Sequence, residues 1–207
     1  VSDIPWDKIT HINYAFAHVN DNNHISIGDP NAQNNPATNM DWPGVAGAEL
    51  DPNLPYKGHF NLLTKYKRQY PDVKTLISVG GWAETGGYFG ENGRVKSGGF
   101  YTMTTNADGS VNHAGIAAFT ESVVAFIKQY GFDGVDIDYE YPSSMEDSGH
   151  PDDFEFSNPR RGALNNSYQV LMKSLREALD REGEKDGVHY MLTIASPSSG
   201  YLLRGME

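Results

Sequence analysis

The chain has 207 residues, enough for one sizeable hydrophobic core or at most two small ones. Its 16 basic and 27 acidic residues give a net charge of −11, which repels phosphate backbones and anionic lipid, so we expect no nucleic-acid partner and no membrane-surface role. The absence of cysteine excludes disulfides, zinc–thiolate sites and thiol nucleophiles, and no apolar run approaches the length that spans a bilayer.

The predicted secondary structure alternates between strands and helices along the chain. The strands are short and rich in β-branched or aromatic residues, whereas the helices show apolar residues at spacings of three and four. Pro71 stops the first helix, and the other two end near Gly131 and Gly183. This alternation is typical of parallel βα units, in a barrel or in an open doubly wound sheet. In chain order the elements are strand 11–19, helix 60–70, strand 73–80, helix 114–130, strand 134–141, helix 166–181 and strand 190–195.

Two long polar insertions, at about 20–58 and 83–113, each follow a predicted strand. Loops of this length in a compact domain are usually functional or disordered, and we favour a role as walls of a cleft. No repeat or low-complexity linker divides the chain, so we expect residues 1–207 to belong to one domain. A complete barrel of eight βα units needs about 250 residues, and only four strands are predicted.

Three carboxylates occupy alternate positions in the strand predicted over 134–141, namely Asp136, Asp138 and Glu140. Alternate residues of a strand share one face, about 6.6–7 Å apart. A central parallel strand is normally apolar on both faces, and carboxylates in file repel each other and lose solvation. Because the fold gains nothing from this arrangement, the pattern predicts a functional site.

Glycosidic cleavage requires such a group of acids. One carboxyl must stay protonated to donate to the leaving oxygen, and crowding by other acids raises its pKa. Glu140 lies nearest the carboxyl end of the strand, where barrel sites form, so we expect it to meet the substrate. Asp138 could hold or stabilise a substrate group, and Asp136 could share a proton with it.

Three other interpretations explain the acids less well. A calcium loop would have glycine where Tyr141 stands and polar residues between the acids. A buried ion-pair network would need cations nearby, and the stretch from Tyr130 to Asp153 contains no lysine or arginine. The strongest alternative is an open doubly wound sheet whose acidic strand ends bind magnesium and a phosphate substrate.

Four motifs along the chain resemble those of the family 18 glycoside hydrolases, the chitinases, and follow one another in the same order as in that family. The most specific is Asp133-x-x-Asp136-x-Asp138-x-Glu140, which Tyr141-Pro142 continues. The segment Ser78-Val79-Gly80-Gly81-Trp82 is similar to the Ser-x-Gly-Gly strand of the family, and Tyr14-Ala15-Phe16-Ala17 to its Tyr-Ala-Phe strand. The stretch 190–197 is similar to the strand that follows the acid strand.

The resemblance implies a role for each acid. Glu140 would be the general acid and then the general base, Asp138 would hold the acetamido N–H of the substrate and stabilise the cation, and Asp136 would be its proton-sharing partner. Asp133 would be a structural member of the motif. In such enzymes the acetamido oxygen of the substrate attacks C1, so the anomeric configuration is retained through an oxazolinium intermediate.

Other positions are expected to shape the cleft rather than react. Gly80 and Gly81 are expected to permit a close backbone approach, beside Ser78 of the same motif. The candidates for lining the sugar cleft are Tyr14, Phe16, Trp82 and Tyr141.

The resemblance also implies a (β/α)8 TIM barrel, of which this chain carries the second to fifth strands with long βα loops. The first strand would precede Val1, and the sixth to eighth would follow Glu207. The expected substrate is chitin or a chitooligosaccharide, the expected location is secreted or extracellular, and no metal or cofactor is implied. The loop at 83–113 is similar to chitinase subunits of bacterial insecticidal toxin complexes, which implies a larger assembly.

Two other functions share this scaffold and its signature. One is a non-catalytic chitin-binding lectin, but such lectins typically replace the acid, and Glu140 is present. The other is an endo-β-N-acetylglucosaminidase that trims N-linked glycans by the same mechanism. The Tyr-Ala-Phe and Tyr-Pro elements favour a chitinase.

Overall fold

The computed structural model describes residues 1–90 and 92–206. Its strands are β1 (His11–Val19), β2 (Ile25–Ser26), β3 (Lys74–Gly80), β4 (Tyr88–Gly90), β5 (Gly93–Val95), β6 (Gly134–Asp138) and β7 (Met191–Ile194). Its helices are α1 (Gly58–Gln69), α2 (Gly99–Thr104), α3 (His113–Tyr130), the 3-10 turn η1 (Pro151–Asp153), α4 (Phe154–Asp186) and α5 (Gly200–Arg204).

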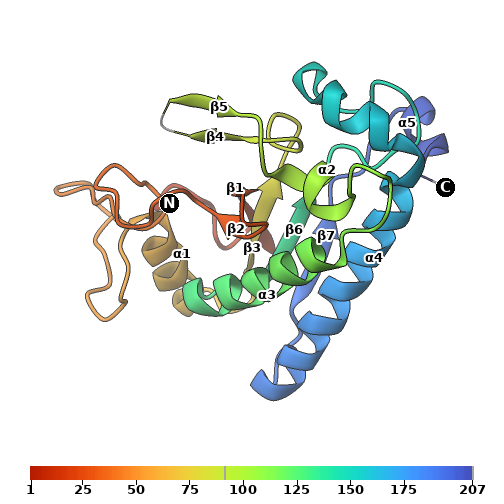
Figure 1. Cartoon of the computed structure of the whole chain (residues 1–207). Coiled ribbons are helices and arrows are strands. Elements are labelled where there is room, and N and C mark those ends of the chain that lie inside the picture. Colours follow the sequence, from red (N-terminus) through yellow and green to blue (C-terminus); the bar gives the residue numbers. More distant parts are fainter. Residues whose placement is uncertain (91, 207) are drawn as a thin grey trace.

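The main sheet has the order β2-β1-β3-β6-β7. The neighbours β1, β3, β6 and β7 are parallel, and β2 pairs antiparallel with the end of β1. The helices α1, α3 and α4 connect the parallel strands in turn and lie side by side (Figure 1). The predicted parallel βα units are therefore confirmed. Within the described residues β7 ends the sheet on one side, and β1 pairs with β2 only at His18 and Val19 on the other.

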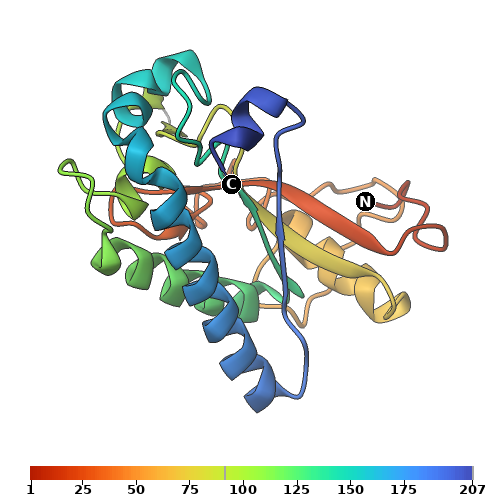
Figure 2. The same cartoon turned by 90° about the vertical axis from the view of Figure 1, so that its right-hand side faces the viewer.

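The core lies between the sheet and these helices. In α3 the side chains at helical spacing, including Ile116, Phe119 and Val123, are almost completely buried, as expected for an amphipathic helix on a sheet. Asn112 begins this helix by accepting a hydrogen bond from the Gly115 N–H at 3.0 Å, and Gly131 ends it with a φ of 72°. Figure 2 shows the long α4 running diagonally across the strands.

The structure corrects the predicted end of the acid strand. We expected the strand to continue to Tyr141, but β6 ends at Asp138. Its last pairing joins Asp138 to Gly80, the final residue of β3, and the Gly81 N–H donates to the Asp138 carbonyl at 2.9 Å. Because β3 ends there, the backbone beyond Asp138 has no strand to pair with. Glu140 therefore lies two residues past the strand.

Two other predictions differ from the structure in extent. The helix predicted over 166–181 extends over Phe154–Asp186 and contains Pro159 near its start. The insertion at 83–113 is not a plain loop, because it forms the hairpin β4–β5 and the helix α2. The hairpin projects from the body of the molecule (Figure 1). In the insertion at 20–58, β2 is the strand that forms.

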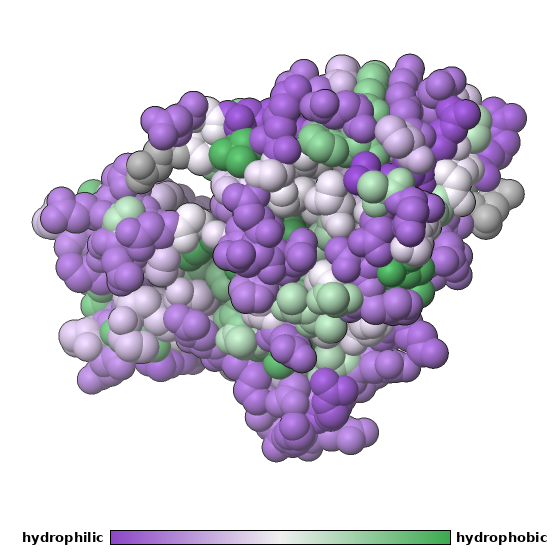
Figure 3. Space-filling model, viewed as in Figure 1, coloured by the Kyte–Doolittle hydropathy of each residue, from purple (hydrophilic) through white to green (hydrophobic). Residues whose placement is uncertain are grey.

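The surface agrees with the acidic composition. The face in Figure 3 is mainly hydrophilic, with small, separated apolar patches. Among the described residues, no helix has both the length and the apolar character needed to cross a membrane.

Candidate active site

Asp136 lies in the middle of β6 and receives three donated hydrogen bonds. The Asn13 amide and the Ser78 hydroxyl donate to its Oδ2 at 2.9 and 2.8 Å, and the Thr193 hydroxyl donates to its Oδ1 at 2.6 Å. These donors come from β1, β3 and β7. Each buried carboxylate oxygen is thus satisfied, which offsets the loss of water at this site.

Asp138, one step nearer the end of the strand, has the opposite environment. It is 8% exposed, and among the described residues its buried Oδ1 has no hydrogen-bond partner. Burial is the main cause that raises the pKa of Asp138 to about 7, followed by the charge and hydrogen bond of Asp136 and the charge of Glu140. Two adjacent carboxylates that cannot both ionise share a proton, so Asp138 can carry one near neutral pH and donate it to Asp136.

Glu140 is half-buried just beyond the strand. Its backbone N–H donates to the Thr85 hydroxyl at 3.0 Å, and the Tyr101 hydroxyl lies 3.5 Å from its carbonyl oxygen. Partial burial raises the pKa of Tyr141 to about 12, with contributions from a hydrogen bond to Glu140 and from the charges of Glu140 and Asp138. Tyr141 and Asp138 therefore both lie near the Glu140 carboxyl group. Non-proline cis peptide bonds join Ala15 to Phe16 and Glu140 to Tyr141.

Asp133 precedes β6 at the other end of the sheet. The Thr75 backbone N–H donates to its Oδ2 at 2.7 Å, and the Lys67 ammonium of α1 lies 2.5 Å from the same oxygen. This carboxylate joins α1 to the start of the sheet. The structure does not bring it together with Glu140.

The two glycines that follow Val79 make room for the acid segment. Gly80 and Gly81 have φ angles of 97° and 81°. A Cβ atom at Gly80 would lie 2.6 Å from the Phe100 ring and 2.8 Å from the Asp138 carbonyl oxygen. At Gly81 a Cβ atom would lie 3.1 Å from the Phe16 ring. Both positions combine a positive φ with close packing, which only glycine accommodates without strain.

Two of the predicted aromatic residues expose much of their surface. Phe16 and Trp82 are 49% and 48% exposed. Phe16 lies within β1, and Trp82 is two residues beyond the end of β3. Phe16 contacts Gly81 as described, and the Trp82 ring packs edge-on against His150 with centroids 4.3 Å apart. We call Phe16, Trp82 and Tyr141 the aromatic margin, and their role in lining the sugar cleft stays a prediction.

Tyr14 lies on the other face of β1, because its neighbour Asn13 faces Asp136. Its hydroxyl is 3.0 Å from His59 Nδ1, and its ring packs edge-on against Phe60, with centroids 5.1 Å apart. Both partners belong to α1. Tyr14 therefore packs between strand and helix, which does not agree with the expectation that it lines the cleft.

Sequence reasoning did not identify Asn13, Thr193 or Thr85. A signal exists for the first two, because each is a polar residue between two apolar neighbours of a predicted strand. Asp136 pairs directly with Ser78 on one side and Thr193 on the other, so strand register would have indicated Thr193. Nothing in the sequence indicates Thr85, whose contact with Glu140 depends on the fold of the 83–113 segment.

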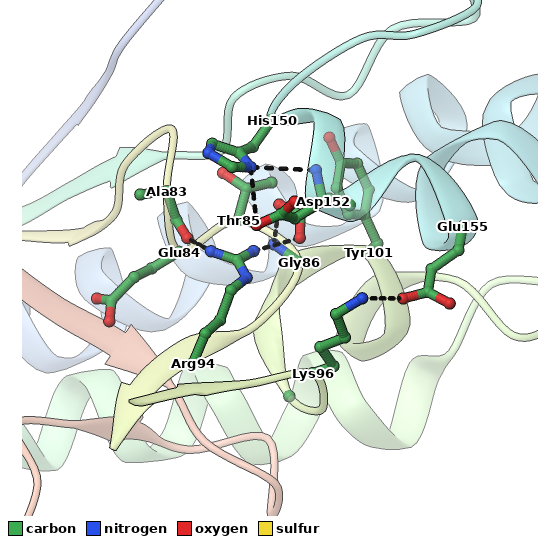
Figure 4. A network of polar contacts seen from close by, with 12 residues as sticks. Ala83, Glu84, Thr85, Gly86, Arg94, Lys96, Tyr101, His150, Asp152 and Glu155 are labelled. Carbon is green, nitrogen blue, oxygen red and sulfur yellow. Dashed lines mark hydrogen bonds and ion pairs between the residues drawn. The ribbon is translucent and has the colours of Figure 1, made fainter. Parts of the chain in front are cut away.

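A polar network fixes the 83–113 segment to η1 (Figure 4). Arg94 of β5 forms an ion pair with Asp153 and donates to the Ala83 carbonyl. The other oxygen of Asp153 accepts the Gly86 N–H at 3.1 Å. The segment from Trp82 to Gly86 is thereby held beside the acid site. Within residues 1–90 and 92–206, no group of three or more His, Asp or Glu side chains is arranged to hold a metal ion.

Comparisons with known proteins agree with this geometry. The family described as "Glycosyl hydrolases family 18" matches residues 1–204. Chitinase A1 of Niallia circulans is 32% identical over 96% of this chain and 28% of its own length. A family GH18 chitinase from Chromobacterium violaceum is 67% identical, with a TM-score of 0.97 over all of this chain and 30% of that one.

A third relative is named for a different activity. An N-acetylglucosaminidase of family 18 from Paenibacillus barengoltzii is 30% identical, with a TM-score of 0.60 over 97% of this chain and 42% of that one. The chain thus spans less than half the length of each of these three relatives. The match over residues 1–204 and the acid strand lead to one conclusion: the chain belongs to glycoside hydrolase family 18.

Proposed function

We propose that this chain carries the acid residues of a chitinase that hydrolyses β-1,4-N-acetylglucosamine linkages. The observation that supports this most strongly is a contrast within the acid group. Asp136 accepts three hydrogen bonds, whereas a buried oxygen of Asp138 has no partner within residues 1–90 and 92–206. An uncompensated buried acid costs stability, so its presence indicates a use in binding or chemistry. Two relatives named as chitinases support the substrate class.

In the proposed reaction Glu140 donates a proton to the glycosidic oxygen as the bond to C1 breaks. The acetamido oxygen of the same sugar attacks C1, which gives an oxazolinium ion without a protein nucleophile. Glu140, now a carboxylate, takes a proton from a water molecule that adds to C1. The product keeps the β configuration, and Glu140 regains its proton.

Asp138 would hold the acetamido group in place for this attack. Its free Oδ1 can accept the acetamido N–H, and its negative charge would stabilise the oxazolinium ion. A pKa of about 7 allows the carboxyl to exchange its proton with Asp136 near neutral pH. In this proposal Asp138 turns from Asp136 toward the acetamido group when substrate binds.

The chain would supply the second to fifth strands of a single eight-stranded catalytic barrel. Four parallel strands with open outer positions and much longer relatives support this assignment. The proposed enzyme is secreted and acts on chitin or chitooligosaccharides, at a cleft bordered by Phe16, Trp82 and Tyr141. Membership of a toxin complex stays a prediction.

A substrate series tests the proposal with the full-length protein. Chitooligosaccharides should be cleaved with the β-anomer as the first product in a ¹H NMR time course. Fully deacetylated chitosan oligomers and cello-oligosaccharides of the same length serve as matched controls and should not be cleaved. Efficient cleavage of either control, or an α-anomer as first product, would exclude the substrate-assisted mechanism.

A second candidate function is release of single N-acetylglucosamine units, as in the name of the Paenibacillus relative. The same acids would catalyse this reaction, so the products released from a hexamer distinguish the two functions. Accumulation of di- and trisaccharides from a hexamer indicates a chitinase, whereas monosaccharide alone from the first minute indicates the N-acetylglucosaminidase. Binding without any product would indicate the lectin.

A further inference from the structure

Thr85 makes an unusual connection between β3 and the acid. Its side chain is completely buried. The Glu140 N–H donates to its hydroxyl oxygen at 3.0 Å, and the hydroxyl donates to the Gly81 carbonyl at 2.9 Å. A hydroxyl has one donor and can accept two bonds, so a single side chain satisfies both contacts.

This contact replaces a missing strand bond. Because β6 ends at Asp138, the Glu140 N–H has no ladder partner, and a buried N–H without a partner is costly. The Tyr101 hydroxyl donates to the Ser148 carbonyl at 3.1 Å and lies 3.5 Å from the Glu140 carbonyl oxygen. Thr85 and Tyr101 both belong to the 83–113 segment, which thus lies against the backbone of Glu140 and binds its N–H through Thr85.

Thr85 is itself firmly placed. Its carbonyl accepts the Phe100 N–H at 2.6 Å, and the neighbouring Gly86 N–H is bound to Asp153. The Phe100 ring stacks on Tyr139 with centroids 5.0 Å apart and an interplanar angle of 10°. Figure 4 shows Thr85 and Gly86 next to the Arg94 network and Tyr101. A hydroxyl held this way can fix the position of the residue that binds to it.

We propose that Thr85 is a positioning residue for Glu140, an inference that rests on the proposed function. Its hydroxyl fixes the peptide group between Tyr139 and Glu140. The Glu140 carboxyl is thereby held in the position from which it can protonate the glycosidic oxygen. Thr85 acts through the backbone and touches no substrate. The 83–113 segment was predicted to form a wall of the cleft. In this proposal it also aligns Glu140.

The leaving group of the substrate separates this role from a purely structural one. Cleavage of a sugar–sugar bond needs a well-placed proton donor, because a sugar alkoxide is a poor leaving group. A 4-nitrophenyl chitobioside releases a much more acidic alcohol and depends less on the donor. A variant with a misplaced acid should lose more kcat on chitohexaose than on the nitrophenyl substrate. A variant that is only less stable should lose equally on both.

Thr85→Val removes the hydroxyl and keeps the shape of the side chain. We expect kcat for chitohexaose to fall by about 10- to 100-fold, as for other small misplacements of catalytic groups, with KM changed by less than about threefold. The loss on the nitrophenyl substrate should be at least about fivefold smaller. Thr85→Ser should restore most of the hexaose activity, because it restores the hydroxyl.

Thr102→Val is the matched control, since it also deletes a threonine hydroxyl that bonds a backbone carbonyl in the same segment, at 2.9 Å from Gly98. It should leave both rates unchanged. If Thr85→Val does not fold, Thr85→Ala removes the same hydroxyl and should give the same ratio of losses. Equal losses on the two substrates, no loss, or failure of serine to restore activity would overturn the proposal.

Glu140→Gln distinguishes this failure from failure of the proposed function. If Glu140→Gln is inactive on chitohexaose and Thr85→Val behaves like wild type, only the positioning role is wrong. If Glu140→Gln keeps its hexaose turnover, the assignment of the acid is wrong, whatever Thr85→Val does.

Discussion

The two ends of β6 hold carboxylates in opposite environments. At the start, Asp133 is bound by the Thr75 N–H and the Lys67 ammonium. At the end, Asp138 has a buried oxygen without a partner in the part of the chain that the structure describes, and burial raises its pKa to about 7. The sequence spacing presents these acids as one motif. Their partners separate a carboxylate that stabilises the fold from one that is available to a substrate.

The first test of this contrast is Asp138→Asn, which should lower kcat on chitooligosaccharides by about 10²- to 10³-fold. The amide cannot stabilise the cation or exchange a proton with Asp136. Steady-state kinetics on the full-length protein measures the loss. If the variant keeps more than about a tenth of the wild-type kcat, Asp138 is not part of the reaction.

The converse test is Asp133→Ala. It leaves the Thr75 N–H without its acceptor and Lys67 without its ion pair, so the free energy of unfolding should fall by about 2–4 kcal/mol. Urea unfolding followed by circular dichroism measures this loss. The kcat per folded molecule should stay near the wild-type value. A large kcat loss without a change in stability would give Asp133 a catalytic role.

The pH dependence of stability sharpens the same contrast. The pKa of Asp138 is about 7 in the folded chain against the ordinary value of 3.8 for an aspartate, so the folded state binds this proton more tightly than the unfolded state. The resulting stabilisation is complete below about pH 4 and is lost as the pH rises through 7. Replacing the Asp138 carboxyl by an amide should therefore increase the free energy of unfolding more at high pH than at low pH.

Unfolding of Asp138→Asn and wild type at pH 4.5 and pH 8 measures this effect. Relative to wild type, the variant should gain at least about 1 kcal/mol between the two pH values. Asp3→Asn, at an exposed position, is the control and should gain nothing. A gain of the same size in both variants would mean that net charge, rather than Asp138, is responsible.

The smallest expected effect is at the aromatic margin of the site. Trp82 is 48% exposed beside the acid segment, and Trp82→Ala should raise KM for chitohexaose by about three- to tenfold with little change in kcat, equivalent to about 1 kcal/mol of lost contact. Val45→Ala, which truncates an exposed apolar side chain in the other insertion, should leave KM unchanged. An unchanged KM in Trp82→Ala would remove this residue from the cleft.

Local pattern was sufficient to predict most of the fold. The strand at His11–Val19 has the predicted ends, β3 begins one residue later than predicted, and β7 is one residue shorter at each end. The end of β6 was wrong because strand length depends on the neighbouring strand, which ends at Gly80. The start of α4 was missed because residues 154–165 are largely polar and contain Pro159.

The acids could be predicted from sequence, but their partners could not. The alternate acidic positions along one predicted strand identified Asp136, Asp138 and Glu140 as candidate site residues. The hydrogen bonds that divide them come from distant residues, since Asn13 is 123 positions from Asp136 and Thr85 is 55 from Glu140. Which carboxylate is compensated is a property of the assembled sheet.

In the proposed mechanism Glu140, two residues beyond the end of β6, donates the proton to the glycosidic oxygen. Turnover of chitohexaose by full-length Glu140→Gln tests this proton donation most directly, with Glu146→Gln as the control, because the Glu146 side chain forms an exposed ion pair with Arg161 at 3.2 Å. We expect Glu140→Gln to lose at least about 10³-fold in kcat while it still binds the hexamer, and Glu146→Gln to keep its activity. A Glu140→Gln enzyme with more than a few per cent of wild-type turnover would contradict the proposed mechanism.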